Sequence, residues 1–102
     1  MKAFLIDPVS QHITQIDLTG AKLEIQERLL AKSVAYEEIG GSTDKLCFDE
    51  DCFILAKPGR FQLDTLAPVA GVALVVGTGE TEDEYLDATL SLEALHGRIR
   101  FL

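Results

Sequence analysis

The chain has 102 residues, enough for one folded domain and too few for two, and its 47% hydrophobic content argues against disorder. Nine basic residues against seventeen acidic ones give a formal charge of -8. This sign argues against binding to nucleic acid or to anionic lipid, because both require clustered Lys and Arg. The first eight residues do not read as a signal peptide, and no apolar run approaches the length of a membrane span. We therefore expect a cytoplasmic protein.

The first elements predict a β-hairpin. Residues 2–7 and 12–18 are rich in apolar or β-branched side chains, and the turn between them contains Pro8. A helix over residues 21–32 should follow, with Thr19 as its N-cap. Ala21, Ile25 and Leu29 share one face of that helix, Leu23 and Leu30 broaden the apolar arc, and Ala31 faces solvent. This helix should lie against a sheet.

Glycines and acidic residues punctuate the middle of the chain. Residues 34–39 should return to extended structure and turn at Gly40 and Gly41. Residues 45–48 and 52–56 flank the acidic triplet 49–51, which predicts a hairpin with a solvated acidic tip. The segment 61–68 reads as irregular, anchored by Phe61, Leu63 and Leu66.

The run 72–76 is continuously apolar, so it predicts a central strand covered on both faces. The acidic segment 80–87 then takes the chain into solvent. Residues 85–89 read as a further strand, and Ser91 should cap a short helix over residues 92–96 that stops at Gly97. Residues 98–102 alternate, with Ile99 and Phe101 facing inward and Arg98 and Arg100 outward.

No residue pattern predicts a catalytic, cofactor or metal site. His12 and His96 lie in no recognisable motif, and His96 suits the C-terminal dipole of the short helix. Cys47 and Cys52 could face each other across the predicted hairpin, but no second Cys or His pair completes a metal site. We interpret both as small buried side chains with free thiols.

Three glycine- or acid-rich segments are candidates for ligand sites. Gly77-Thr78-Gly79 lacks the third glycine of a dinucleotide fingerprint and the Gly-Lys-Ser/Thr of a phosphate loop, so a turn is the better interpretation. Neither 49–51 nor 80–87 has the spacing of a calcium-binding loop, and solvated loops explain both.

The order of these elements and three short motifs carry a resemblance. The chain begins Met1-Lys2, has Glu38-Ile39 after the main helix, and ends its apolar run with Val75-Val76-Gly77. It resembles a family of small uncharacterised proteins of phages and bacterial mobile elements. The resemblance implies no established activity and supplies no catalytic residues.

We expect an α+β single domain over residues 1–102, with a strongly bent, mainly antiparallel sheet or partial barrel, one main helix and a short C-terminal helix. A non-enzymatic accessory protein that binds a protein partner is favoured, without nucleic acid, membrane or cofactor. The alternative is a small-ligand binding module with its pocket between helix 21–32 and the sheet. A protein-binding role predicts an exposed apolar patch rimmed by acid.

The same reasoning favours a homodimer over a closed monomer. One good helix should cover one face of the sheet and leave the other poorly covered. Arg98 and Arg100 could then meet acidic residues of segment 80–87 in a second copy, or satisfy those of their own chain.

Overall fold

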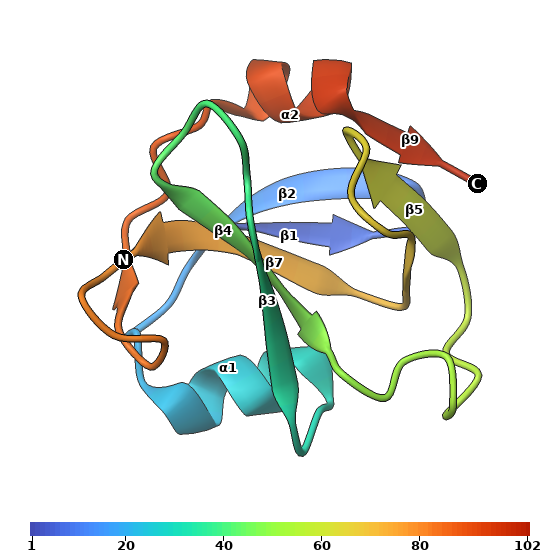
Figure 1. Ribbon diagram of the computed structural model, residues 1–102, viewed down its shortest axis with the longest axis horizontal. Coiled ribbons are helices and arrows are strands. Elements are labelled where there is room, and N and C mark those ends of the chain that lie inside the picture. The colour runs from blue at the N-terminus through green and yellow to red at the C-terminus, as the bar shows by residue number, and fades with distance from the viewer.

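The computed structural model describes residues 1–102 as nine strands and two helices (Figure 1). Their bounds are β1 (Lys2–Asp7), β2 (His12–Asp17), α1 (Lys22–Leu29), β3 (Val34–Glu38), β4 (Asp44–Asp49), β5 (Arg60–Leu63), β6 (Val69–Ala70), β7 (Ala73–Thr78), β8 (Tyr85–Leu86), α2 (Leu92–Arg98) and β9 (Ile99–Phe101). A six-stranded sheet runs β2-β1-β7-β4-β3 with β8 paired to β7, and a three-stranded sheet runs β6-β5-β9. Every pairing is antiparallel, and neither sheet closes into a barrel. The predicted α+β class is confirmed.

The predicted central strand is β7. It pairs with β1 on one side and β4 on the other, and its residues 73–77 are all buried. Side chains of β7 alternate between two core clusters, so Val75 belongs to one and Leu74 to the other. A fully apolar run needs this cover on both faces, as its sequence predicted.

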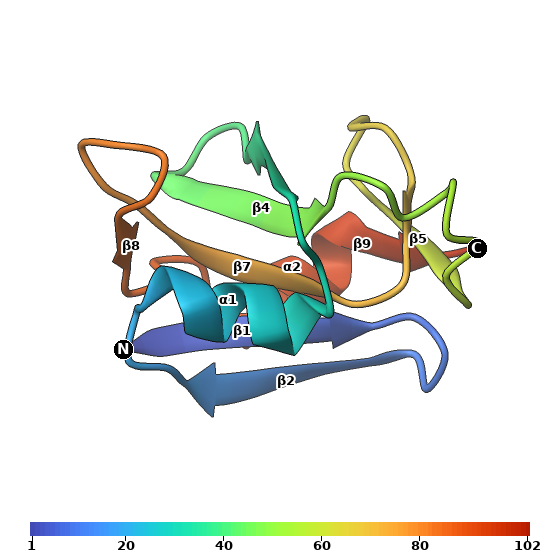
Figure 2. The same ribbon diagram turned by 90° about the horizontal axis from the view of Figure 1, so that it is seen from below.

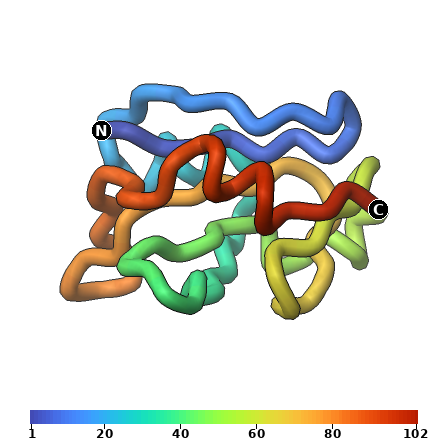
Figure 3. The backbone as a smooth tube through the Cα atoms, turned by 90° about the horizontal axis from the view of Figure 1, so that it is seen from above, coloured from blue at the N-terminus to red at the C-terminus, as the bar shows by residue number.

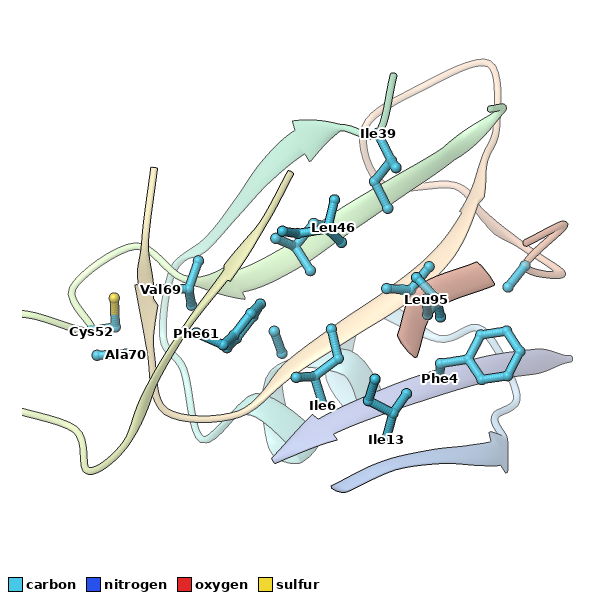
Figure 4. Packing of buried hydrophobic residues seen from close by; sticks show 14 residues of the cluster. Phe4, Ile6, Ile13, Ile39, Leu46, Cys52, Phe61, Val69, Ala70 and Leu95 are labelled. Carbon is cyan, nitrogen blue, oxygen red and sulfur yellow. The ribbon is translucent and has the colours of Figure 1, made fainter. Parts of the chain in front are cut away.

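Both faces of the sheet are covered within one chain. α1 packs Ile25 and Leu29 against one face, and both side chains are fully buried. On the other face, Phe61 from β5 and Leu95 from α2 join Phe4 and Ile6 from β1 (Figure 4). The expectation that one face stays poorly covered is therefore wrong, because the second sheet and α2 supply the missing layer.

Helix α1 is shorter than the predicted 21–32. Its N-cap is Ala21, not Thr19, whose hydroxyl and amide instead donate to the Glu24 carboxylate. Leu30 ends the helix in the left-handed region with φ 51, so the chain reverses before residue 32. The reversal buries Ala31 and exposes Leu30, opposite to the predicted pattern, and Leu23 is exposed as well.

The predicted hairpin between residues 45–48 and 52–56 is wrong. Both edges of β4 are already occupied, by β3 and by β7, so no third strand can pair with it. Residues 50–55 form turns instead, and only Cys52 of that segment points into the core. Conversely, the segment 61–68, predicted as irregular, begins inside β5, where Phe61 and Leu63 are buried as expected.

Of the local predictions near the C-terminus, the helix start is confirmed and the helix end is wrong. The Ser91 hydroxyl accepts from the Ala94 amide at 3.0 Å, which confirms the predicted cap of α2. Gly97 does not stop this helix, which continues to Arg98 before the chain becomes extended at Ile99. Arg98 and Arg100 stay within their own chain, where Arg98 pairs with Asp64 and Arg100 donates to Gln62.

Candidate functional site

The most exposed apolar segment of the molecule is the turn that follows β4. Phe53, Ile54 and Leu55 leave 51%, 84% and 60% of their surface exposed. We call these three residues the apolar tip. The exposed Glu50 and half-buried Asp51 precede them, so the tip has an acidic flank. Three consecutive exposed apolar side chains make this turn a candidate interaction surface.

The base of the tip is held by an ion pair whose carboxylate is buried and whose lysine is partly buried. Lys57 Nζ lies 2.7 Å from Asp49 Oδ2, and Asp49 is only 2% exposed. The same ammonium donates to the carbonyls of Leu29 and Leu30 at 2.8 and 3.0 Å, where α1 ends. One lysine thus joins the end of β4, the end of α1 and the segment after the tip. The triplet 49–51 is therefore not simply a solvated loop.

The segment after the tip also packs against the β1–β2 turn. Gly59 has φ +76, and a Cβ there would lie 2.9 Å from Pro8 Cγ and from the Val9 amide. An apolar hollow of about 180 Å³ opens beside this contact, and Val9, Leu30, Pro58 and Val72 contribute to its lining. The tip therefore projects from a well-anchored base that carries further exposed apolar surface.

A second cluster is centred on Lys45, which lies near the start of β4, at the opposite end of this strand from the apolar tip. Lys45 is 4% exposed, and its ammonium donates to the carbonyls of Glu82 and Glu84 at 2.9 and 3.1 Å. Its Nζ lies 4.7 Å from the ring centroids of both Tyr36 and Tyr85. Two carbonyl dipoles and two ring faces hold this charge, and no carboxylate is bonded to it.

The titratable side chains around Lys45 have raised pKa values, which favour their neutral forms. The two tyrosine hydroxyls share a hydrogen bond of 2.6 Å, and burial raises the pKa of both Tyr36 and Tyr85. Burial also raises the pKa of Cys47 to about 12, against a smaller lowering by Lys45. Cys47 is therefore a protonated thiol at neutral pH, which does not suit a nucleophile.

A cavity of about 290 Å³ lies beside this cluster and opens to solvent. Its lining includes Tyr36 and Lys45 together with Glu38, Glu80 and Glu82. A neighbouring hollow of about 270 Å³ lies at the margin of α1. Lys22 and Gln26 of α1 and Val34 and Tyr36 of β3 contribute to its lining, so this hollow lies where a pocket between the main helix and the sheet was predicted. The centre of that interface is closed, because the buried Ile25 and Leu29 fill it.

The histidines and cysteines weighed from the sequence are not brought together. His12 on β2 and His96 on α2 are both exposed. Cys47 and Cys52 are free and buried in different core clusters, so they do not face each other across a hairpin. Gly77 lies inside β7 rather than in a turn. A Cβ at this position would come within 2.3 Å of the Asp87 carbonyl oxygen, so the close approach of the segment after β8 requires glycine.

A second carboxylate, Asp44, is buried without having been predicted to be so. Asp44 is 1% exposed and accepts hydrogen bonds from the Thr89 amide, the Thr89 hydroxyl and the Leu90 amide, each at 2.8 Å. It fastens the segment before α2 to the start of β4, 45 residues away in the sequence. No local pattern around Asp44 distinguishes it from a surface residue.

No three His, Cys, Asp or Glu side chains are grouped as a metal ion would require. None of the helices has the length and apolar character needed to span a membrane. Comparison with protein-family models, with curated protein sequences and with solved structures gives no match to this chain.

Proposed function

We propose that this protein is a small non-enzymatic accessory protein that binds another protein through its apolar tip. The observation that carries the proposal is the exposure of Phe53, Ile54 and Leu55 on a base anchored by Lys57 and Asp49. A rigid base lowers the entropy lost when a protruding apolar loop is immobilised by a partner. The apolar patch with an acidic flank is the surface that the sequence analysis associated with protein binding.

The chemistry of the tip defines the expected partner surface. Phe53 is the natural anchor, because aromatic side chains dominate the binding energy of protein interfaces. Arg60 lies 5.6 Å from the centroid of the Phe53 ring, so the tip has one basic neighbour as well as the acidic Glu50 and Asp51. The two carboxylates and the formal charge of -8 favour a partner whose apolar pocket has a basic rim on the side that meets Glu50 and Asp51. The partner's identity would come from co-purification with mass spectrometry.

The test compares two substitutions of exposed apolar residues. Ile54→Asp alters the tip, whereas Leu23→Asp alters an equally apolar site on α1 that is 65% exposed. We expect the protein and the Leu23→Asp variant to retain the same co-purifying partner from the native cells, and Ile54→Asp to lose it. If Ile54→Asp retains every partner while remaining folded by circular dichroism, the tip is not the binding surface.

A small-ligand binding role is the second candidate, and the cavity beside Lys45 favours it. Its lining holds three carboxylates, of Glu38, Glu80 and Glu82, against the one ammonium of Lys45, and this excess of acid beside a tyrosine ring would suit a small organic cation. Titration with a polyamine such as spermidine tests this role by calorimetry. Binding that weakens in a Glu80→Gln/Glu82→Gln variant would support it, and absence of heat at millimolar ligand would exclude it for this class.

The kinship with phage and mobile-element proteins is part of the same proposal. In the fold, the motifs that suggested it occupy the start of β1, the end of β3 and β7. An accessory role would place the gene beside other genes of such elements, and inspection of its genomic neighbourhood tests this directly.

A further inference from the structure

The main sheet has two outer edges, formed by β2 and β3. β2 pairs only with β1, over its full length from His12↔Asp7 to Asp17↔Lys2. Figures 2 and 3 show β2 at the periphery of the molecule with no segment beyond its outer side. Six residues of regular strand therefore present one unpaired row of backbone groups.

The unpaired backbone groups can be assigned from the ladder. Met1 and Leu18 exchange two backbone hydrogen bonds just beyond the strand ends. Bonded and non-bonded pairs alternate in an antiparallel ladder, so Ile16, Thr14 and His12 are bonded to β1. The amides and carbonyls of Ile13, Gln15 and Asp17 must then point outward. The Lys2 carbonyl agrees with this phase, since it turns away from β2 to accept from Ala88.

The side chains along β2 offer no protection against pairing. Residues 12–16 contain no proline, glycine, lysine or carboxylate, and the strand has no bulge relative to β1. Exposed edges of native sheets usually carry such devices. The opposite edge does carry them, because Glu37 and Glu38 on β3 are exposed and would repel the same strand of a second copy.

The densest acidic segment of the protein lies away from β2. In Figure 2 the acidic loop between β7 and β8 lies on the opposite side of the molecule from β2. Asp17 is the one acidic residue of the strand, and Lys2 lies directly across from it on β1. A second copy can therefore approach this edge without bringing two acidic surfaces together.

We propose that β2 is a dimer interface that pairs antiparallel with β2 of a second copy about a two-fold axis. The outward groups are centred on Gln15, so full use of them places Gln15 opposite Gln15 of the partner subunit. Ile13 then lies opposite the partner's Asp17, and about six backbone hydrogen bonds join the copies. The two main sheets then form one continuous sheet, in which the face covered by α1 in one copy continues into the face covered by α1 in the other. This interface replaces the one expected at Arg98 and Arg100, which already bind their own chain.

Light scattering at ~100 μM protein tests the proposal, with amide hydrogen exchange by NMR as the second measurement. We expect a mass of twice 11.2 kDa. Amides of Ile13, Gln15 and Asp17 should be protected, and dilution should remove that protection. Gln15→Lys should yield a monomer with native circular dichroism, because it sets two lysines face to face at the axis.

Thr81→Lys is the matched control, since it adds the same charge at an exposed site of the acidic loop. It should remain dimeric. A mass near 11.2 kDa for the unsubstituted protein overturns the proposal. So does a dimer that Gln15→Lys leaves intact, or one whose three amides exchange freely. A dimer disrupted only by Thr81→Lys would place the interface at the acidic loop instead.

Discussion

Lys45 and Lys57 are both held by backbone carbonyls, but the two lysines neutralise their charge in different ways. Lys57 has a buried carboxylate partner, Asp49, and joins three segments beneath the apolar tip. Lys45 has two carbonyls and two tyrosine rings, and it fastens the acidic loop before β8. When one partner of a buried ion pair is removed, the charge of the other is left without a countercharge. When a charge held by carbonyl dipoles and aromatic rings is removed, no opposite charge is left behind.

The largest effect should come from breaking the ion pair on one side. Asp49→Asn leaves the partly buried Lys57 ammonium without a countercharge, at the point where β4, α1 and the tip meet. We expect the free energy of unfolding to fall by about 3–5 kcal/mol. Urea denaturation measures this loss, with Glu27→Gln as the control, an exposed carboxylate on α1 that should change stability by no more than about 0.5 kcal/mol.

Replacing both Asp49 and Lys57 distinguishes the contribution of the ion pair from that of the hydrogen bonds that Lys57 donates to α1. An Asp49→Leu/Lys57→Met variant has no buried charge, so it should recover most of the stability lost by Asp49→Asn. If the double variant is as unstable as the single one, the hydrogen bonds from Lys57 to α1 carry the stability instead of the ion pair.

Lys45→Met should have a smaller effect. Methionine keeps apolar contact with the rings of Tyr36 and Tyr85, and the two carbonyls released at Glu82 and Glu84 belong to exposed residues. We expect a loss of about 1–2 kcal/mol in the free energy of unfolding. Hydrogen exchange of amides in residues 80–84 should accelerate.

Lys22→Met is the matched control on the same loop, because Lys22 makes an exposed ion pair with Asp83 at 3.3 Å. It should leave both stability and exchange nearly unchanged. A loss of about 3–5 kcal/mol on Lys45→Met would show that Lys45 and Lys57 contribute to stability in the same way.

Local patterns predicted the parts of the fold that local chemistry determines. The apolar run at β7, the β1–β2 hairpin and the Ser91 cap each follow from a few neighbouring residues. The segment 52–56 was misread because its apolar composition suits a strand, while the two edges of β4 were already taken by partners from elsewhere.

The two lysine clusters could not be predicted in the same way. Lys57 reaches carbonyls 28 and 27 residues away, and Lys45 reaches carbonyls 37 and 39 residues away. A single charged residue gives no sequence sign of burial, so Asp49 was read as part of a solvated triplet. The exposed apolar tip was missed for the same reason, because its burial was assumed from composition.

The environment of Lys45 also predicts a loss of stability in alkali. Burial raises the pKa of Cys47 from an ordinary 9.0 to about 12, so the folded state keeps a proton that the unfolded state releases. The stabilisation is complete below pH 9 and is lost as pH rises toward 12. We expect the loss in the free energy of unfolding to amount to about 1 kcal/mol by pH 10. Cys47→Ala should therefore show a shallower fall in Tm between pH 8 and pH 10.5.

Val76→Ala is the control for this pH dependence. It removes apolar volume from the same core cluster without removing a titrating group. Its Tm should be lower at every pH and should fall as steeply as that of the unsubstituted protein. Equal slopes for Cys47→Ala and the unsubstituted protein would show that Cys47 does not contribute.

The smallest effect should come from the exposed pair between Arg98 and Asp64. The Arg98 guanidinium donates to both carboxylate oxygens, at 3.0 and 2.5 Å, and these hydrogen bonds hold the pKa of Asp64 below its ordinary value. Both side chains remain about a third exposed, so solvent and salt screen the pair. Asp64→Asn should cost about 0–1 kcal/mol at pH 7. A carboxyl group whose pKa is lowered by folding stabilises the folded state at pH values above its ordinary pKa. The difference in stability between the two proteins should therefore disappear as the pH falls through the pKa of Asp64 in the folded state.

Urea denaturation of both proteins at pH 7 and pH 3, each in low and in 1 M salt, measures these differences. Arg98 makes two hydrogen bonds to Asp64, whereas Lys57 Nζ lies 2.7 Å from Asp49 Oδ2 without a hydrogen bond to it, so the exposed pair has the better geometry and the Asp49 pair the deeper burial. A cost below about 1 kcal/mol that shrinks in salt would assign the large effect at Asp49 to desolvation. A cost of 3 kcal/mol or more at Asp64 would show that hydrogen-bond geometry, rather than burial, sets the strength of ion pairs in this protein.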